Sequence, residues 1–168
     1  MARVAFVLAD DFEDAEFRVP YDRLQAAGHE VTVVGVKAGK PLHGKRGKER
    51  FAPTLAAESA SVEDFDALVI PGGYSPDKLR MDDHVVSLAR DFDRAAKPLA
   101  AICHAGSLLI EAEAVGGRRV TSWPSIKTDL INAGATWLDA EVVEDGHLIS
   151  SRKPDDLDSF CAAILRRL

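Results

Sequence analysis

The stretch that decides the fold of this chain is Leu99-Ala100-Ala101-Ile102-Cys103-His104-Ala105-Gly106-Ser107-Leu108-Leu109-Ile110. An apolar run of the right length for one buried strand ends at the cysteine, and an apolar run with helical spacing follows it. Small residues at Ala101, Ala105 and Gly106 allow the strand and the helix to approach closely around a sharp turn. This pattern predicts a nucleophile elbow, which holds a reactive side chain above the edge of an α/β sheet.

Cys103 has two interpretations at this point. At an elbow its thiol faces a helix N-terminus, where unpaired N–H groups and the helix dipole favour a thiolate. Alternatively it is a structural residue, because unpaired cysteines are among the most buried residue types. The pattern alone leaves both interpretations open.

Length and charge limit the classes of protein that this chain can belong to. Its 168 residues are most simply one domain over residues 1–168, long enough to bury about two-thirds of the unfolded surface. The net charge of −6 argues against nucleic acid or an anionic membrane as the main partner. Basic residues gather between Lys37 and Arg50, but no aromatic residue follows until Phe51, so a solvated loop or hairpin is favoured.

Neither the cysteines nor the histidines have the spacing of a metal site. Cys103 and Cys161 are the two cysteines, which give no disulfide framework, and the five histidines lie far apart in the sequence. Cys161 lies on the apolar stripe of the last expected helix and is interpreted as core packing. We therefore expect no metal.

The N-terminal half excludes two further classes. No G-x-G-x-x-G follows the first expected strand, so Glu30 lacks its phosphate loop and NAD binding is rejected. The apolar run Val4 to Ala9 is too short for a signal peptide, and no run approaches the ~20 residues of a membrane span. We expect a cytoplasmic protein.

Strands and helices are expected to alternate, which predicts an α/β fold. The expected strands cover residues 3–8, 29–36, 66–70, 99–102, 141–144 and 147–150, and a hairpin lies within 38–57. A further short strand is expected directly before the turn Thr121-Ser122-Trp123-Pro124. The expected helices cover residues 20–27, 76–81, 84–96, 106–115, 126–133 and 155–168. Pro20 is placed at the start of the long helix because an interior proline loses a hydrogen bond, and Gly28 is expected to close that helix. Residues 12–19 are expected to form either a turn or a first helical stretch over the strand end.

The turn Pro71-Gly72-Gly73 directly follows one of the expected strands. Paired glycines at the carboxyl end of a parallel strand expose backbone N–H groups where such sheets bind ligands. The turn is interpreted either as half of an oxyanion hole or as a simple tight turn.

Four ordered motifs together resemble a known family. They are Phe12-Glu13-Asp14-Ala15-Glu16, Leu68-Val69-Ile70-Pro71-Gly72-Gly73, Ala101-Ile102-Cys103-His104 and Thr121-Ser122-Trp123-Pro124-Ser125-Ile126-Lys127. Over essentially its whole length the chain is similar to the PfpI-like intracellular proteases. These belong to the class I glutamine-amidotransferase-like superfamily that includes the parkinsonism-associated protein deglycase. The resemblance implies a flavodoxin-like three-layer α/β/α sandwich with a mostly parallel central sheet and its active site at the strand carboxyl ends.

The resemblance also implies roles for individual residues. Cys103 matches the nucleophile, His104 its neighbour, and Glu16 the buried glutamate beside the thiol. Without the family, a solvated position in the first turn of a helix would be the favoured interpretation of Glu16. Asp77 matches an acidic residue that some members contribute from an adjacent subunit to orient the histidine. The oxyanion and substrate are expected to be bound by Gly72, Gly73, His104 and Trp123.

The implied function is a cofactor-independent, cysteine-dependent hydrolase or lyase in stress protection. Its substrates would be small reactive carbonyls, glycated proteins or peptides, and it would form a homodimer or a higher homo-oligomer. The alternative is a non-enzymatic stress protein that senses peroxide by oxidation of Cys103. In both cases we expect the pKa of Cys103 to lie well below about 8.5.

Two positions depart from the family pattern. Ala105-Gly106 stands where the family usually has Gly-Pro after Cys-His, which affects the tightness of the elbow. Asp77 replaces the more usual glutamate and is one methylene shorter, which weakens the expected triad between subunits.

Overall fold

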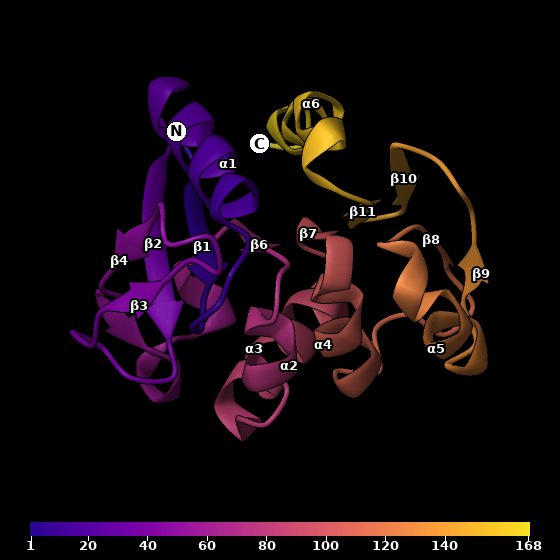
Figure 1. Cartoon of the computed structure of the whole chain (residues 1–168), viewed down its shortest axis with the longest axis horizontal. Coiled ribbons are helices and arrows are strands. Elements are labelled where there is room, and N and C mark those ends of the chain that lie inside the picture. The colour runs from indigo at the N-terminus through magenta and orange to yellow at the C-terminus, as the bar shows by residue number, and fades with distance from the viewer.

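The computed structural model describes all residues from Met1 to Leu168, and a seven-stranded sheet forms its centre (Figure 1). The strand order is β10-β11-β7-β6-β1-β2-β5. These strands are β1 (Arg3–Val7), β2 (Glu30–Gly35), β5 (Leu55–Ala56), β6 (Ala67–Ile70), β7 (Leu99–Ile102), β10 (Val142–Asp145) and β11 (Leu148–Ser151). All neighbours are parallel except β10 and β11. The prediction of a mostly parallel sheet is confirmed.

The central strands are apolar throughout because both faces of the sheet are covered. In β1, Phe6 belongs to one hydrophobic cluster, whereas its neighbours Ala5 and Val7 belong to the other. Successive side chains of a strand point to opposite faces, so a strand that is buried on both sides has no polar alternation.

The helices form a layer on each face of the sheet (Figure 1). α1 (Asp14–Ala26) and α6 (Leu157–Leu165) pack against each other on one face, and Phe17 of α1 contacts Phe6 edge-on. The opposite face carries α2 (Ser75–Leu79), α3 (Asp83–Arg94), α4 (Gly106–Glu111) and α5 (Lys127–Asn132). This three-layer arrangement confirms the flavodoxin-like sandwich. None of the helices combines the length and the apolar character that crossing a membrane requires.

The first helix starts earlier than Pro20, so of the two alternatives for residues 12–19 the helical one is confirmed from Asp14 onwards. α1 begins at Asp14 and continues through Pro20. The proline ring removes one backbone donor, and burial of Phe17 and Leu24 against the sheet outweighs that loss. The end is as predicted: Gly28 has φ +84°, and its N–H donates to the Gln25 carbonyl.

Two other helices are shorter than predicted. α4 ends at Glu111 because Glu113, with φ +59°, takes the left-handed position that usually falls to glycine. α6 covers only Leu157–Leu165, and a 3₁₀ turn at Pro154–Asp156 precedes it. Cys161 of α6 is buried in the core, as predicted.

Short strands complete the fold. β3 (Leu42–His43) and β4 (Arg50–Phe51) form the predicted hairpin. β8 (Arg119–Val120) is the short strand expected before Thr121. It pairs in parallel with β9 (Thr136–Trp137), which the sequence did not predict because two residues carry no recognisable periodicity.

Asp14, at the start of α1, holds the loop between β3 and β4. Its buried carboxylate accepts hydrogen bonds from the backbone N–H groups of Arg46, Lys48 and Glu49, at 2.8–2.9 Å. Burial alone would raise the pKa of Asp14, but these donors outweigh it and lower the pKa. The loop is therefore fixed beside the carboxyl ends of the strands.

Substitution of Asp14 by asparagine is expected to reduce the free energy of unfolding by about 1–3 kcal/mol, because the charge and one acceptor are lost. Denaturant unfolding at neutral pH measures the change. Asp22→Asn on the same helix is the matched control, since the exposed Arg18–Asp22 pair is worth at most about 0.5 kcal/mol. Equal effects of the two substitutions would show that Asp14 does not anchor the loop.

Candidate active site

Cys103 lies at the junction between β7 and the helical layer. β7 ends at Ile102, a 3₁₀ turn spans Cys103–Ala105, and α4 begins at Gly106. The φ angle of Cys103 is +64°, a left-handed conformation that is unfavourable for a residue with a Cβ atom. Strand and helix fix the chain on both sides of the cysteine, as expected of a nucleophile elbow.

Glu16 is fully buried behind this cysteine, so the solvated position is excluded. Its Oε2 accepts a hydrogen bond of 2.9 Å from the Gly72 N–H, whereas its Oε1 has no hydrogen-bond partner. A side chain at Gly72 would overlap both this carboxylate and the Cβ of Cys103. The prediction that Gly72 binds the oxyanion is corrected, because its N–H is already committed to Glu16.

The environment of Glu16 favours the neutral acid. Burial raises its pKa to about 8, the nearby Glu13 carboxylate also raises it, and the Gly72 N–H opposes both. At neutral pH the side chain is therefore largely protonated and can donate a hydrogen bond towards the thiol.

The prediction of a low pKa for the Cys103 thiol is contradicted. Burial and the negative charge of ionised Glu16 raise this pKa to about 12, and the backbone N–H groups of Gly73 and His104 lower it only in part. The reason lies in the tertiary structure: Cys103 is only 7% exposed, and its thiol lies near the carboxyl group of Glu16. Protonation of Glu16 removes the charge that causes part of the shift.

The imidazole of His104 contacts the thiol directly. Its Nδ1 lies 3.3 Å from Sγ of Cys103, and its Nε2 lies 3.0 Å from Oγ of Ser125. Burial and the nearby ammonium of Lys45 lower the pKa of His104, so the ring is neutral at neutral pH. A neutral ring in contact with a thiol can take its proton.

The two predicted oxyanion donors that remain, the N–H groups of Gly73 and His104, both contact the sulfur. Gly73 has φ +78° and packs so tightly against the backbone of Asp11 and Glu13 that a side chain there would overlap it. An oxygen bonded to a carbon on Sγ would lie within reach of these donors.

The thiol opens into a cleft of about 740 Å³. Trp123 lines it with its side chain partly exposed, and the Trp123 ring centroid lies 6.5 Å from that of His104. Lys45 and Arg46 also line the cleft, where both form ion pairs with the buried Glu13 at 2.8 and 2.7 Å. Both residues are exposed on the predicted hairpin, and their ion pairs with Glu13, from a distant part of the chain, hold them at the edge of the cleft.

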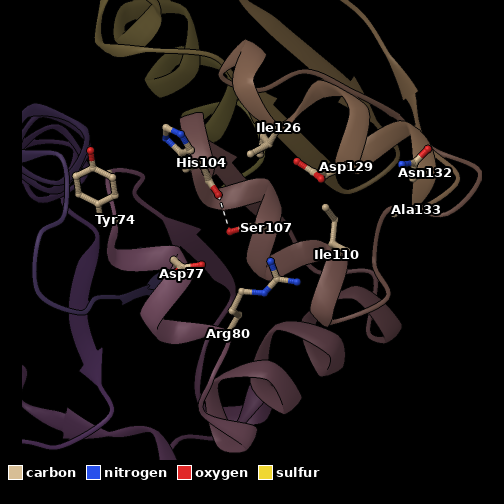
Figure 2. A pocket seen from close by; sticks show the side chains of 11 residues that line it. Tyr74, Asp77, Arg80, His104, Ser107, Ile110, Ile126, Asp129, Asn132 and Ala133 are labelled. Atoms are coloured by element: carbon tan, nitrogen blue, oxygen red, sulfur yellow. Dashed lines mark hydrogen bonds between the residues drawn. The ribbon is translucent and has the colours of Figure 1, made fainter.

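A second cleft of about 610 Å³ lies on the other side of His104 (Figure 2). It shares Gly73, Tyr74 and His104 with the first cleft. Asp77 lines this second cleft, is exposed and makes no hydrogen bond or ion pair within the chain, so the structure does not bring it to His104.

Sequence reasoning missed three residues of the site. They are Ser125, Glu13 and Lys45, and the first two stand within quoted motifs without an assigned role. No three histidine, cysteine, aspartate or glutamate side chains are grouped so that they could hold a metal ion.

Comparisons with known proteins agree with the fold and with the motifs. The family model described as "DJ-1/PfpI family" matches residues 2–167. "Protein/nucleic acid deglycase 2" of Escherichia coli is 43% identical over 167 residues, covering 99% of this chain and 97% of that protein. "General stress protein 18" of Bacillus subtilis is 43% identical over 159 residues, covering 94% of this chain and 92% of that protein.

A solved structure matches over almost the whole chain. It is a two-domain protein from Anabaena variabilis with DJ-1/ThiJ/PfpI-like and ferritin-like domains. The TM-score is 0.98 at 39% identity, and the match covers 99% of this chain but only 48% of that one. The two-domain protein is therefore about twice as long as the part that this chain matches.

Proposed function

Because this chain belongs to the DJ-1/PfpI family, we propose that it is a cysteine-dependent enzyme of the deglycase type. Its substrates would be reactive dicarbonyls such as methylglyoxal, or the early adducts that they form with protein side chains. The name of the Escherichia coli relative supports this class of reaction. We further propose that residues 1–168 act as one domain without a cofactor.

One observation carries the proposal. Sγ of Cys103 lies between a neutral imidazole, 3.3 Å away, and the buried carboxyl of Glu16, which has an oxygen without a partner. One group can take a proton and the other can supply one, which is the combination that addition of a thiol to a carbonyl needs.

In the proposed reaction, Nδ1 of His104 takes the proton of Cys103, and the sulfur attacks the aldehyde carbon of the substrate. A C–S bond forms, and the electron pair of the carbonyl moves to its oxygen, which the N–H groups of Gly73 and His104 stabilise. Glu16 supplies the proton that makes the hemithioacetal. Transfer of hydrogen from that carbon to the neighbouring carbonyl carbon gives a thioester of a hydroxy acid, and water releases the acid and restores the thiol.

The proposal is tested by giving the purified protein three substrates: methylglyoxal, a peptide glycated by methylglyoxal, and casein. We expect hydroxy acid from the first two without added thiol, and slower or no cleavage of casein. Absence of hydroxy acid with both carbonyl substrates would reject the deglycase-type function, and cleavage of casein alone would assign a peptidase instead.

The second candidate is a peroxide sensor in stress protection, which the name of the Bacillus subtilis relative favours. Mild peroxide is expected to add oxygen to Cys103, which lines the cleft, and to leave Cys161 unmodified, because Cys161 is buried in the core away from both clefts. Peptide mass spectrometry measures both sites. Equal modification of the two cysteines would contradict this assignment.

We also propose that the protein forms a homodimer or a higher homo-oligomer in which Asp77 of one subunit lies near His104 of another. Asp77→Ala is then expected to lower peptidase or amidase activity only a few fold, because Ser125 already contacts His104 within the chain. Thermal stability should change little, since an exposed charge contributes about 0–1 kcal/mol. Mixing Asp77→Ala with inactive Cys103→Ala should, after subunit exchange, raise the rate per intact Cys103 by up to the few-fold factor that Asp77→Ala lost. A monomer in light scattering at micromolar concentration would contradict the arrangement.

A further inference from the structure

Both ring nitrogens of His104 have a partner within one chain. Nδ1 lies 3.3 Å from Sγ of Cys103, and Nε2 lies 3.0 Å from Oγ of Ser125. A neutral imidazole carries one N–H, so one of these contacts is donated by the ring and the other is accepted by it. Which is which decides whether His104 can act as a base.

Ser125 is held in place relative to the elbow. It belongs to the 3₁₀ turn Pro124–Ile126, and the preceding residue, Trp123, donates its N–H to the carbonyl of Cys103 at 3.2 Å. The Ser125 hydroxyl makes no hydrogen bond other than the one to His104. The backbone hydrogen bond between Trp123 and Cys103 therefore keeps Ser125 next to His104.

Asp77, the residue that the sequence predicted to orient His104, does not contact Nε2 within one chain. Figure 2 shows Asp77 on α2, across the second cleft from His104, and no hydrogen bond joins the two side chains. Within one chain, Ser125 alone contacts the nitrogen that faces away from the thiol.

We propose that Ser125 is the positioning residue of His104: its Oγ accepts a hydrogen bond from Nε2–H, which leaves the lone pair of Nδ1 directed at the thiol of Cys103. The inference rests on the proposed role of His104 as the base. In the reverse tautomer, Nδ1–H would point at the sulfur and the ring could not take the thiol proton. Ser125 thus completes a cysteine–histidine–serine arrangement within a single chain.

The proton balance follows directly. The S–H bond of Cys103 breaks, the proton moves to Nδ1, and the electron pair stays on the sulfur for attack on the carbonyl carbon. His104 then carries two N–H groups and a positive charge. The Nε2–H still donates to the Ser125 oxygen, which stabilises the imidazolium without taking its proton.

Other charged and titratable groups share the surroundings of His104. Besides Cys103, those in the first cleft are Glu13, Glu16, Lys45, Arg46, Tyr74, Lys153 and Asp155. Those in the second cleft are Tyr74, Asp77, Arg80 and Asp129. None of them is hydrogen-bonded to the ring apart from the thiol, so removal of the Ser125 hydroxyl is expected to change the tautomer directly.

The test uses the full chain in a Cys161→Ala background, with Ser125→Ala, Ser125→Thr and Ser107→Ala variants. Ser107 is the matched control, because its hydroxyl donates to the backbone carbonyl of His104 rather than to the ring (Figure 2). The ¹⁵N chemical shifts of the His104 ring report the tautomer, and iodoacetamide alkylation across pH reports the reactivity of Cys103. Neither readout requires turnover.

In the parent protein we expect the Nε2–H tautomer. Ser125→Ala should give a mixture of tautomers and slow both alkylation near neutral pH and turnover about threefold to tenfold, the range for loss of one neutral hydrogen bond. Ser125→Thr should restore both, and Ser107→Ala should change neither.

An Nδ1–H tautomer in the parent, or unchanged tautomer and alkylation in Ser125→Ala, would overturn the inference. If the ring behaves as expected but no carbonyl substrate is turned over, the proposed function fails while the positioning by Ser125 stands.

Discussion

Replacement of Cys103 by alanine is expected to lower turnover of methylglyoxal and of glycated peptides by at least about 10³-fold. The reason is that every proposed step passes through a bond to this sulfur, and no other nucleophile of comparable strength faces the cleft. The steady-state rate of hydroxy-acid formation measures the loss. Alanine keeps the Cβ atom, so the strain at φ +64° is unchanged and only one sulfur atom is lost; the melting temperature should stay within a few degrees of the parent.

Cys161→Ala is the matched control for this substitution. Cys161 is also buried and also unpaired, but it lies on α6, where it lines neither cleft. Its removal is expected to cost some stability and no activity. Residual turnover in Cys103→Ala within tenfold of the parent would show that the reaction does not use this thiol.

Glu16→Gln has the second-largest expected effect. Glutamine can still accept the Gly72 N–H, but its amide is a far weaker acid than the carboxyl group that supplies the proton. Turnover is expected to fall by about 10²-fold or more, the range for loss of a positioned acid. In the parent, activity should decline as the pH rises through about 8, where Glu16 ionises, and the variant should lack this decline.

The same substitution is expected to stabilise the protein. Burial raises the pKa of Glu16 from 4.5 to about 8 in the folded state, so between these pH values the folded chain holds a proton that the unfolded chain has lost. Stability therefore falls as the pH rises from about 4.5 to about 8, and the penalty remains above that window. Glutamine never ionises, so its advantage should be on the order of a few kcal/mol at pH 8 and should vanish near pH 4.

Glu144→Gln is the control for the sign of this effect. The guanidinium groups of Arg167 and Arg166 lower the pKa of Glu144, so its contribution is present at neutral pH and is lost as the pH falls. Glu144→Gln should thus be slightly destabilising at pH 8. Equal stability of Glu16→Gln and the parent across this pH range would show that Glu16 is not held in a neutral state by burial.

Helix α1 shows which features of a helix can be predicted from local sequence and which cannot. Gly28 ends the helix as predicted, because the positive φ of that position is a local requirement. The start stayed open between a turn and a helical stretch, because the rule against an interior proline takes no account of the hydrophobic core beneath the helix. Extending α1 back to Asp14 buries Phe17, and it also carries Glu16 to the cysteine.

The sequence by itself determined the elements whose information is local. The apolar runs of β1, β6 and β7, the small residues around Cys103 and the glycines after β6 were sufficient for a parallel sheet with a cysteine at its carboxyl edge. These features depend on side-chain size, on hydrophobicity and on the backbone angles of neighbouring residues. Such properties can be recognised in one stretch of chain.

Only the tertiary structure decided the chemical state of the site. Three properties of the site arise from residues that lie in different segments of the chain. They are the protonated state of Glu16, the raised pKa of Cys103 and the hydrogen bond between Ser125 and His104. The pKa of a group depends on its burial and on the charges around it, and a hydrogen bond depends on distances of a fraction of an ångström. Those quantities exist only once the sheet has brought the ends of its strands together.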